Sequence, residues 1–126
     1  MSDVAMRFVV LRHETREETH WDLMLDRGLG APGLATWRLV APPHADAAES
    51  IAAVRIGDHR RAYLDYEGSL SGDRGTVARY DAGIYRVIHA TDQAWELDFD
   101  GRRLKGRYGL SVNGLGGPSD WLLRRL

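Results

Sequence analysis

Residues 20–25 read HWDLML, and this short stretch decides the fold class of the chain. Its odd-numbered positions hold a tryptophan and two leucines, and its even-numbered positions hold His20, Asp22 and Met24. Because successive side chains of a β-strand point to opposite faces, this alternation is typical of a half-buried strand. We expect the odd-numbered side chains to be buried and His20 and Asp22 to face a groove or the solvent.

Similar short runs of apolar and β-branched residues recur along the chain, separated by glycine-rich turns. The runs predicted as strands cover residues 6–11, 34–40, 62–66, 76–80, 83–90, 94–99, 103–112 and 120–126. A turn is expected at Ala82 and Gly83, between two of these runs. Short strands in close succession, without the alternating helices of a parallel sheet, indicate an all-β, mainly antiparallel barrel or sandwich.

One stretch, residues 45–55, favours a helix, because it is rich in alanine and contains neither proline nor glycine. Gly57 is a suitable residue to end such a helix. A strand over residues 51–56 is the competing interpretation. The chain is therefore expected to contain at most one short helix.

The composition limits the class of protein. The chain has 126 residues, of which 44% are hydrophobic and 28% charged, so a single globular domain over residues 1–126 is expected. A net charge of −1 argues against a wholly basic surface but leaves a local basic groove open. The absence of cysteine excludes disulfides, cysteine-bound zinc and thiol nucleophiles. Without a secretion signal or an apolar run of membrane-spanning length, a bacterial-type cytoplasmic protein is expected.

His20 and Asp22 are two residues apart on the same face of the predicted strand, so their polar ends can converge on one ion or water. If the first two strands pair, the connecting loop returns His13 to a position beside His20. Two imidazoles and one carboxylate suit a divalent ion such as Mn²⁺ or Zn²⁺. The alternative is an exposed polar strand face with His13 in a loop.

A second set of residues, His59, Arg60 and Tyr63, could hold a phosphate. An imidazolium, a guanidinium and a phenol can together bind a phosphate and offset the charge that develops on it during hydrolysis. A histidine can also donate a proton to a leaving oxygen. The alternative is structural: His59 ends a turn, Tyr63 lies in the core, and Arg60 is solvated.

The remaining aromatic and imidazole side chains have simpler interpretations. His44 is expected on the surface and His89 within the sheet. The four tryptophans lie in strand-like runs and are expected in the core rather than as base-stacking platforms. These are Trp21, Trp37, Trp95 and Trp121.

Several segments, taken in order, resemble the 3′-phosphoesterase domain of bacterial DNA ligase D. The opening segments are residues 8–13 (FVVLRH), 20–26 (HWDLMLD) and 34–37 (LATW). The later segments are residues 58–68 (DHRRAYLDYEG), 72–79 (GDRGTVAR), 104–106 (LKG) and 121–123 (WLL). The resemblance covers most of the chain and involves several independent segments.

The resemblance implies a small β-barrel with a polar groove and a Mn²⁺-dependent enzyme that trims the 3′ ends of DNA. Such an enzyme removes a terminal ribonucleoside and then the 3′-phosphate. By position, His13, His20 and Asp22 match the metal ligands of the family, and His59 and Tyr63 match the groups that contact the phosphate. The expected partners are nucleic acid 3′ ends and a DNA ligase or polymerase of an end-joining system, and the expected state is a monomer.

The sequence also departs from the family pattern. Met24 stands where the family carries an arginine, and few residues precede the first strand where the ligases have a polar arm, so a stand-alone, divergent member is expected. An uncharged thioether cannot grip a phosphate. The replacement cation is left open among Arg12, Arg60, Arg61 and Arg74. A non-catalytic relative that binds nucleic-acid ends, phosphate or a repair partner through the same groove is the alternative function.

Overall fold

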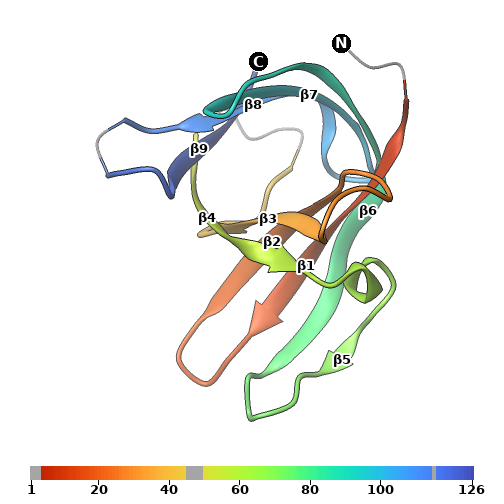
Figure 1. Ribbon diagram of the computed structural model, residues 1–126. Helices are drawn as coiled ribbons and strands as arrows, with labels where there is room; N and C mark the ends of the chain where they lie inside the picture. The colour runs from red at the N-terminus through yellow and green to blue at the C-terminus, as the bar shows by residue number, and fades with distance from the viewer. Residues whose placement is uncertain (1–3, 45–49, 115) are drawn as a thin grey trace.

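The alternating runs of the sequence form nine strands in the computed structural model, which describes residues 4–44, 50–114 and 116–126 (Figure 1). The strands are β1 (Met6–Glu14), β2 (Thr19–Asp26), β3 (Leu34–Leu39), β4 (Ile51–His59), β5 (Gly68–Ser69), β6 (Thr76–Ala90), β7 (Ala94–Asp100), β8 (Lys105–Val112) and β9 (Asp120–Arg125). Eight of them close into an antiparallel barrel in the order β1, β2, β3, β4, β9, β8, β7, β6, because β6 pairs back onto β1. The predicted all-β antiparallel barrel is confirmed.

β6 is the longest strand, and it connects the barrel to the region below it in Figure 1. Its C-terminal part pairs with β7, its N-terminal part pairs with β1, and its first residues also pair with the short β5. The predicted turn at Ala82 and Gly83 is wrong, since both residues lie within β6. Glycine is needed at position 83 for a different reason: a Cβ there would lie 2.2 Å from the carbonyl oxygen of Asp100 on β7.

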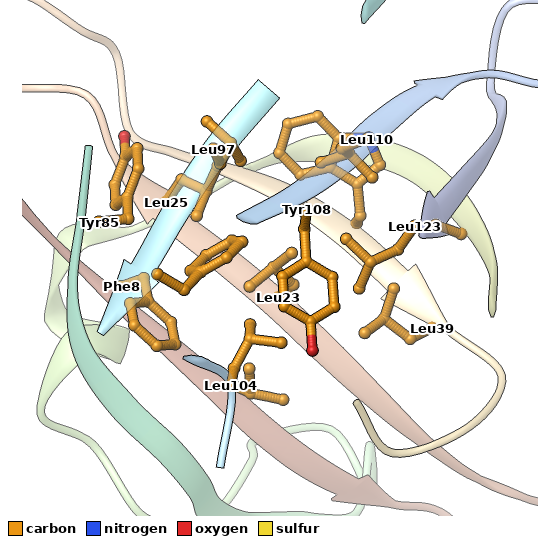
Figure 2. Packing of buried hydrophobic residues seen from close by; sticks show 14 of the residues in the cluster. Phe8, Leu23, Leu25, Leu39, Tyr85, Leu97, Leu104, Tyr108, Leu110 and Leu123 are labelled. Carbon is orange, nitrogen blue, oxygen red and sulfur yellow. The ribbon is translucent and has the colours of Figure 1, made fainter. Parts of the chain in front are cut away.

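The main core fills the interior of the barrel. The inward side chains of β1 and β2 pack there against aromatic and leucine side chains from the opposite wall (Figure 2). The labelled members are Phe8, Leu23, Leu25, Leu39, Tyr85, Leu97, Leu104, Tyr108, Leu110 and Leu123. Trp37 and Trp121 are buried in this cluster, which confirms the prediction for these two, and Trp21 and Trp95 pack against it partly buried.

A second apolar cluster lies on the outer face of β1 and β2. It contains Val9, Leu11 and Met24, whose side chains alternate with those that point into the barrel. Leu64 covers this face from the segment between β4 and β6. Because an apolar outer face would otherwise meet water, its burial ties this connecting segment to the barrel.

The segment that covers the outer face contains η1 (Arg61–Leu64), a single turn of 3₁₀ helix. It is the one helical element among the residues that the structure describes. The strand predicted at residues 62–66 is therefore wrong. In a strand, Tyr63 and Leu64 would point to opposite faces, whereas the tight turn lets both pack against the outer cluster. Arg61 fixes the turn, because its guanidinium donates hydrogen bonds to both carboxylate oxygens of Asp26 at the end of β2, at 2.7 and 2.8 Å.

The helix expected over residues 45–55 is wrong for residues 51–55. Residues 45–49 lie outside the described residues, and residues 51–55 belong to β4, as in the competing strand interpretation. Ile51 and Ala53 are buried while Ala52 and Val54 are exposed, so a period of two governs this stretch. Pairing with β3 and β9 overrides the helix propensity of alanine here. Within the described part of the chain, no helix is both long and apolar enough to cross a bilayer.

Candidate functional site

The candidate site is a pocket of about 700 Å³ on the outer face of the β1–β2 pair. The outer apolar cluster forms part of its wall, and the segment from β4 to β6 contributes further lining residues. Its polar and charged lining side chains are His13, Thr15, Glu17, Glu18, His20, Asp22, Arg38, Asp58, His59, Arg60, Tyr63, Asp73 and Arg74. All six residues of the two predicted sets therefore line one pocket.

His13 and His20 meet because β1 and β2 form a hairpin. The two residues are direct partners in the antiparallel register, as the sequence predicts for paired strands. Their imidazole rings lie edge to face, with centroids 4.6 Å apart. Asp22 is on the same face of β2 as His20, one strand repeat further along.

The ligand atoms of these three residues converge. One nitrogen from each histidine and one carboxylate oxygen of Asp22 all lie within 4.8 Å of one another. His13 Nδ1 is 3.6 Å from Asp22 Oδ2, and His20 Nε2 is 3.4 Å from Asp22 Oδ1. Two imidazoles and one carboxylate at such separations can be bridged by one divalent cation and leave further coordination positions open.

A hydrogen bond fixes the orientation of the His13 ring. His13 Nε2 lies 2.7 Å from the carbonyl oxygen of Arg74, and since a carbonyl only accepts, this nitrogen carries the proton. In the neutral tautomer with this hydrogen bond, Nδ1 is the acceptor nitrogen, and it is the one that faces Asp22. A metal-binding histidine commonly has its second nitrogen held in this way by a backbone carbonyl.

His20 and Asp22 are buried with polar atoms that need a partner. Both ring nitrogens of His20 and Oδ1 of Asp22 have no hydrogen-bond partner among the described residues. Burial lowers the pKa of His20 below its usual range, against the opposing effect of the Asp22 carboxylate, and Arg38 and His13 lower it further. The imidazole is thus held neutral, which is the form that binds metals. The unpartnered buried atoms and the type of donors together fit a divalent cation.

The second predicted set lines the same pocket as the first. His59 ends β4, and its Nδ1 donates a hydrogen bond to the carbonyl oxygen of Gly57 at 3.0 Å, which leaves Nε2 for a ligand. The rings of His59 and Tyr63 pack edge to face at 5.7 Å, and the Arg60 guanidinium lies 5.7 Å from the Tyr63 ring. Tyr63 is only partly buried, so it contributes both to the outer cluster and to the pocket wall.

The structure distinguishes the arginines left open by the sequence. Arg60 and Arg74 line the pocket. Arg12 pairs with Glu14 and Arg61 pairs with Asp26, and neither is among the pocket-lining residues. His44 and His89 are exposed and lie outside the pocket, as predicted for a surface and a sheet residue.

Arg38 is a pocket residue that the sequence analysis missed. It lies on β3 directly opposite Asp22 in the β2–β3 register, with its Nε 3.7 Å from Asp22 Oδ1. That Nε is buried and has no hydrogen-bond partner among the described residues. The alternation of residues 34–39 could have indicated the face of Arg38, but only the β2–β3 register places it beside Asp22.

Comparisons with known proteins agree with the geometry. The family model described as the DNA ligase D 3′-phosphoesterase domain matches residues 11–111. The multifunctional non-homologous end joining protein LigD of Pseudomonas aeruginosa is 30% identical over 127 aligned positions, which cover 94% of this chain. The chain spans 15% of the length of that relative.

Proposed function

The chain belongs to the DNA ligase D 3′-phosphoesterase domain family, and on that premise we propose that it is a metal-dependent phosphoesterase acting on the 3′ ends of DNA. One observation carries the proposal: His13, His20 and Asp22 bring three ligand atoms within 4.8 Å of one another in the pocket that also holds His59 and Tyr63. A cation site beside groups that suit a phosphate is the arrangement expected for phosphate-ester hydrolysis.

His13 Nδ1, His20 and Asp22 would hold the cation, with Mn²⁺ as the proposed ion and another divalent ion such as Zn²⁺ as the alternative. When bound, the ion would supply a positive charge that polarises the phosphate and lowers the pKa of the attacking water. The carbonyl of Arg74 orients His13, and burial keeps His20 neutral. The protein thereby presents a fixed set of ligands on two paired strands.

The other side chains of the pocket act on the phosphate itself. In the proposed reaction, water attacks phosphorus, the bond to O3′ breaks, and a 3′-hydroxyl and inorganic phosphate are released. His59 and Arg60 offset the negative charge that develops on the transferred group, and the Tyr63 hydroxyl donates a hydrogen bond to it. Arg38 supplies the cation next to the metal ligands that Met24 cannot supply.

The biological setting follows from the family. A free 3′-hydroxyl is what a polymerase or ligase needs, so the protein would prepare DNA ends by removing a 3′-phosphate or a 3′-ribonucleotide. Similarity to a protein named for non-homologous end joining supports end repair as the context. We propose that residues 1–126 act as one phosphoesterase-like domain, as a monomer in a bacterial cytoplasm, together with a ligase or polymerase.

The proposal is tested by phosphate release from a primer–template that carries a 3′-phosphate, in the presence of Mn²⁺. Wild type should release phosphate, and His20→Ala should not. The matched control is His89→Ala, which removes an exposed imidazole of β6 outside the pocket and should leave release unchanged. Absence of release from wild type with any divalent ion would contradict the proposal. Salt-dependent binding of the same DNA without turnover would instead identify the non-catalytic relative.

A further inference from the structure

A second pocket of about 270 Å³ adjoins the candidate site. The two pockets share four lining residues, so they lie next to each other. The shared residues are Arg60, Tyr63, Leu70 and Arg74. The second pocket adds Tyr66 and the polar Ser69 and Ser71, and it is not needed to hold a metal or a single phosphate.

A row of aromatic rings leads from the first pocket into the second. His59 packs edge to face on Tyr63 with a centroid distance of 5.7 Å, and Tyr63 packs in the same way on Tyr66 at 6.0 Å. Tyr66 stands at the outer end of the row and is 38% exposed. An exposed ring at the end of a depression is available to a flat ligand group.

The Tyr66 side chain is anchored at its hydroxyl end. Its hydroxyl donates a hydrogen bond to the carbonyl oxygen of Ser69 in β5. Gly68 makes room for this arrangement, since a Cβ at that position would approach the Tyr66 hydroxyl oxygen to 3.2 Å. A fixed aromatic face loses little conformational freedom when a ligand stacks on it.

The border between the two pockets is positively charged. Arg60 and Arg74 are both exposed there, and neither forms an ion pair with a carboxylate of the described residues. Arg74 is braced by hydrogen bonds to the carbonyl and hydroxyl oxygens of Ser71 at 2.7 and 3.0 Å. The nearby Asp58 and Asp73 are paired with Arg27 and Arg16, which reduces their repulsion of an anion.

We propose that the second pocket is a strand-binding subsite, which takes the nucleotide chain next to the 3′-phosphate. Tyr66 stacks on a base, and Arg74 contacts backbone phosphate at the border. This inference rests on the proposed function for the direction of the strand, since the 3′ end would enter the first pocket.

Binding to a single-stranded oligothymidylate with a 3′-phosphate tests the subsite, measured by fluorescence anisotropy with EDTA and with Mn²⁺. Tyr66→Ala and Tyr66→Leu should raise the Kd about tenfold, because both remove the stacking ring, while Tyr66→Phe should stay within about twofold. A strand of the same length without bases should bind all four proteins alike. Equal binding of oligothymidylate by wild type, Tyr66→Ala and Tyr66→Leu would overturn the proposal, as would no detectable binding by wild type in low salt.

The contribution of the Arg74 charge to strand binding is tested by comparing two arginine variants. Arg74→Ala should weaken binding of both strands and reduce the slope of log K against log salt by about one. Arg86→Ala, on an exposed part of β6 outside both pockets, should leave the slope unchanged. An unchanged slope in Arg74→Ala would remove Arg74 from the subsite.

These binding measurements separate the subsite from the chemistry. Wild type that releases phosphate while Tyr66→Ala binds normally would retain the proposed function and overturn the subsite. Wild type that releases no phosphate while Tyr66→Ala loses base-dependent binding would support the subsite and contradict hydrolysis.

Discussion

His13 and His20 are seven residues apart in the sequence, yet their rings lie 4.6 Å apart because they face each other across the β1–β2 ladder. The hairpin thus presents two imidazoles on one outer face, with Asp22 completing the group. Each of the three comes from a strand rather than a loop, so the separation of the ligand atoms is set by strand pairing.

Loss of a single ligand should abolish tight metal binding. His20→Ala and Asp22→Asn are each expected to weaken Mn²⁺ binding more than about 100-fold, since even changes in residues that only support ligands cost 10- to 100-fold. Isothermal titration measures the affinity directly. Mn²⁺ should raise the melting temperature of wild type and of His89→Ala but not of His20→Ala. Equal stabilisation of all three proteins would show that the ion binds elsewhere.

Arg38, rather than position 24, is expected to supply the cation beside the metal ligands. Arg38→Met should reduce turnover by about 10²- to 10³-fold, as for loss of one group that stabilises the transition state. Met24→Arg should not raise turnover, and it should destabilise the protein by about 2 kcal/mol or more, because Met24 is 1% exposed within the outer cluster. Steady-state kinetics and urea unfolding measure the two effects. Faster turnover in Met24→Arg, with no loss in Arg38→Met, would reverse the assignment.

His59 and Tyr63 should affect phosphate chemistry without affecting metal affinity. His59→Ala is expected to lower kcat by about 100-fold, and Tyr63→Phe, which keeps the packed ring, by about tenfold. The measurement is phosphate release alongside Mn²⁺ titration of the same samples. His44→Ala is the matched control, since that imidazole is exposed outside the pocket. Weaker Mn²⁺ binding in His59→Ala would mean that His59 belongs to the metal site instead.

Tyr85 should make the protein sensitive to alkaline pH. Its hydroxyl donates a hydrogen bond to the carbonyl oxygen of Asp26 at 2.7 Å, and burial raises its pKa well above the ordinary value of 10.0. A raised pKa in the folded state means that this contribution is intact below about pH 10 and is lost as the pH rises further, because the unfolded chain then ionises first.

The Tyr85→Phe variant tests this predicted direction of the change in stability with pH. Near pH 7 it should cost about 1 kcal/mol of unfolding free energy through the lost hydrogen bond. Above about pH 10 the difference from wild type should shrink and then reverse, since phenylalanine has no group to ionise. Urea unfolding across this pH range gives the comparison. Two parallel stability curves would be inconsistent with a raised Tyr85 pKa.

The turn between β7 and β8 should depend on one buried carboxylate. Asp81 accepts hydrogen bonds from the backbone N–H groups of Ala82, Arg102, Arg103 and Leu104. Asp81→Ala leaves these donors unpaired and should cost about 3 kcal/mol or more. Asp100→Asn, an exposed change at the end of β7, should cost little. Chemical denaturation measures the unfolding free energy of both variants, and similar values would contradict the role of Asp81.

The sequence predicts the parts of the molecule that depend on local alternation. The strand containing His20 and Asp22 and the return of His13 beside His20 both follow from a period of two and a short loop. Elements decided by distant contacts are not predictable in this way. Residues 51–55 favour a helix locally, but pairing with β3 and β9 makes them a strand.

The pocket was predictable only in part for the same reason. The apolar run at residues 8–11 fits a strand that is buried on both faces, but no local pattern indicates that a tight turn at residues 61–64 covers the outer one. Arg38 becomes recognisable only when β3 is set in register beside β2. What the sequence does not contain is the pairing between segments far apart in the chain.

The double pairing of β1 has a consequence for how the molecule matures. During translation, the hairpin bearing His13, His20 and Asp22 leaves the ribosome before the Arg74 carbonyl that orients His13 and before the β6 residues that pair with the other edge of β1, which follow some sixty residues later. The nascent chain thus contains all three candidate metal ligands before it contains the segment that orients His13 and the strand that closes the barrel. Pairing of β6 with β1 completes the surroundings of these three side chains, so we expect tight binding of a divalent cation only after the barrel has closed.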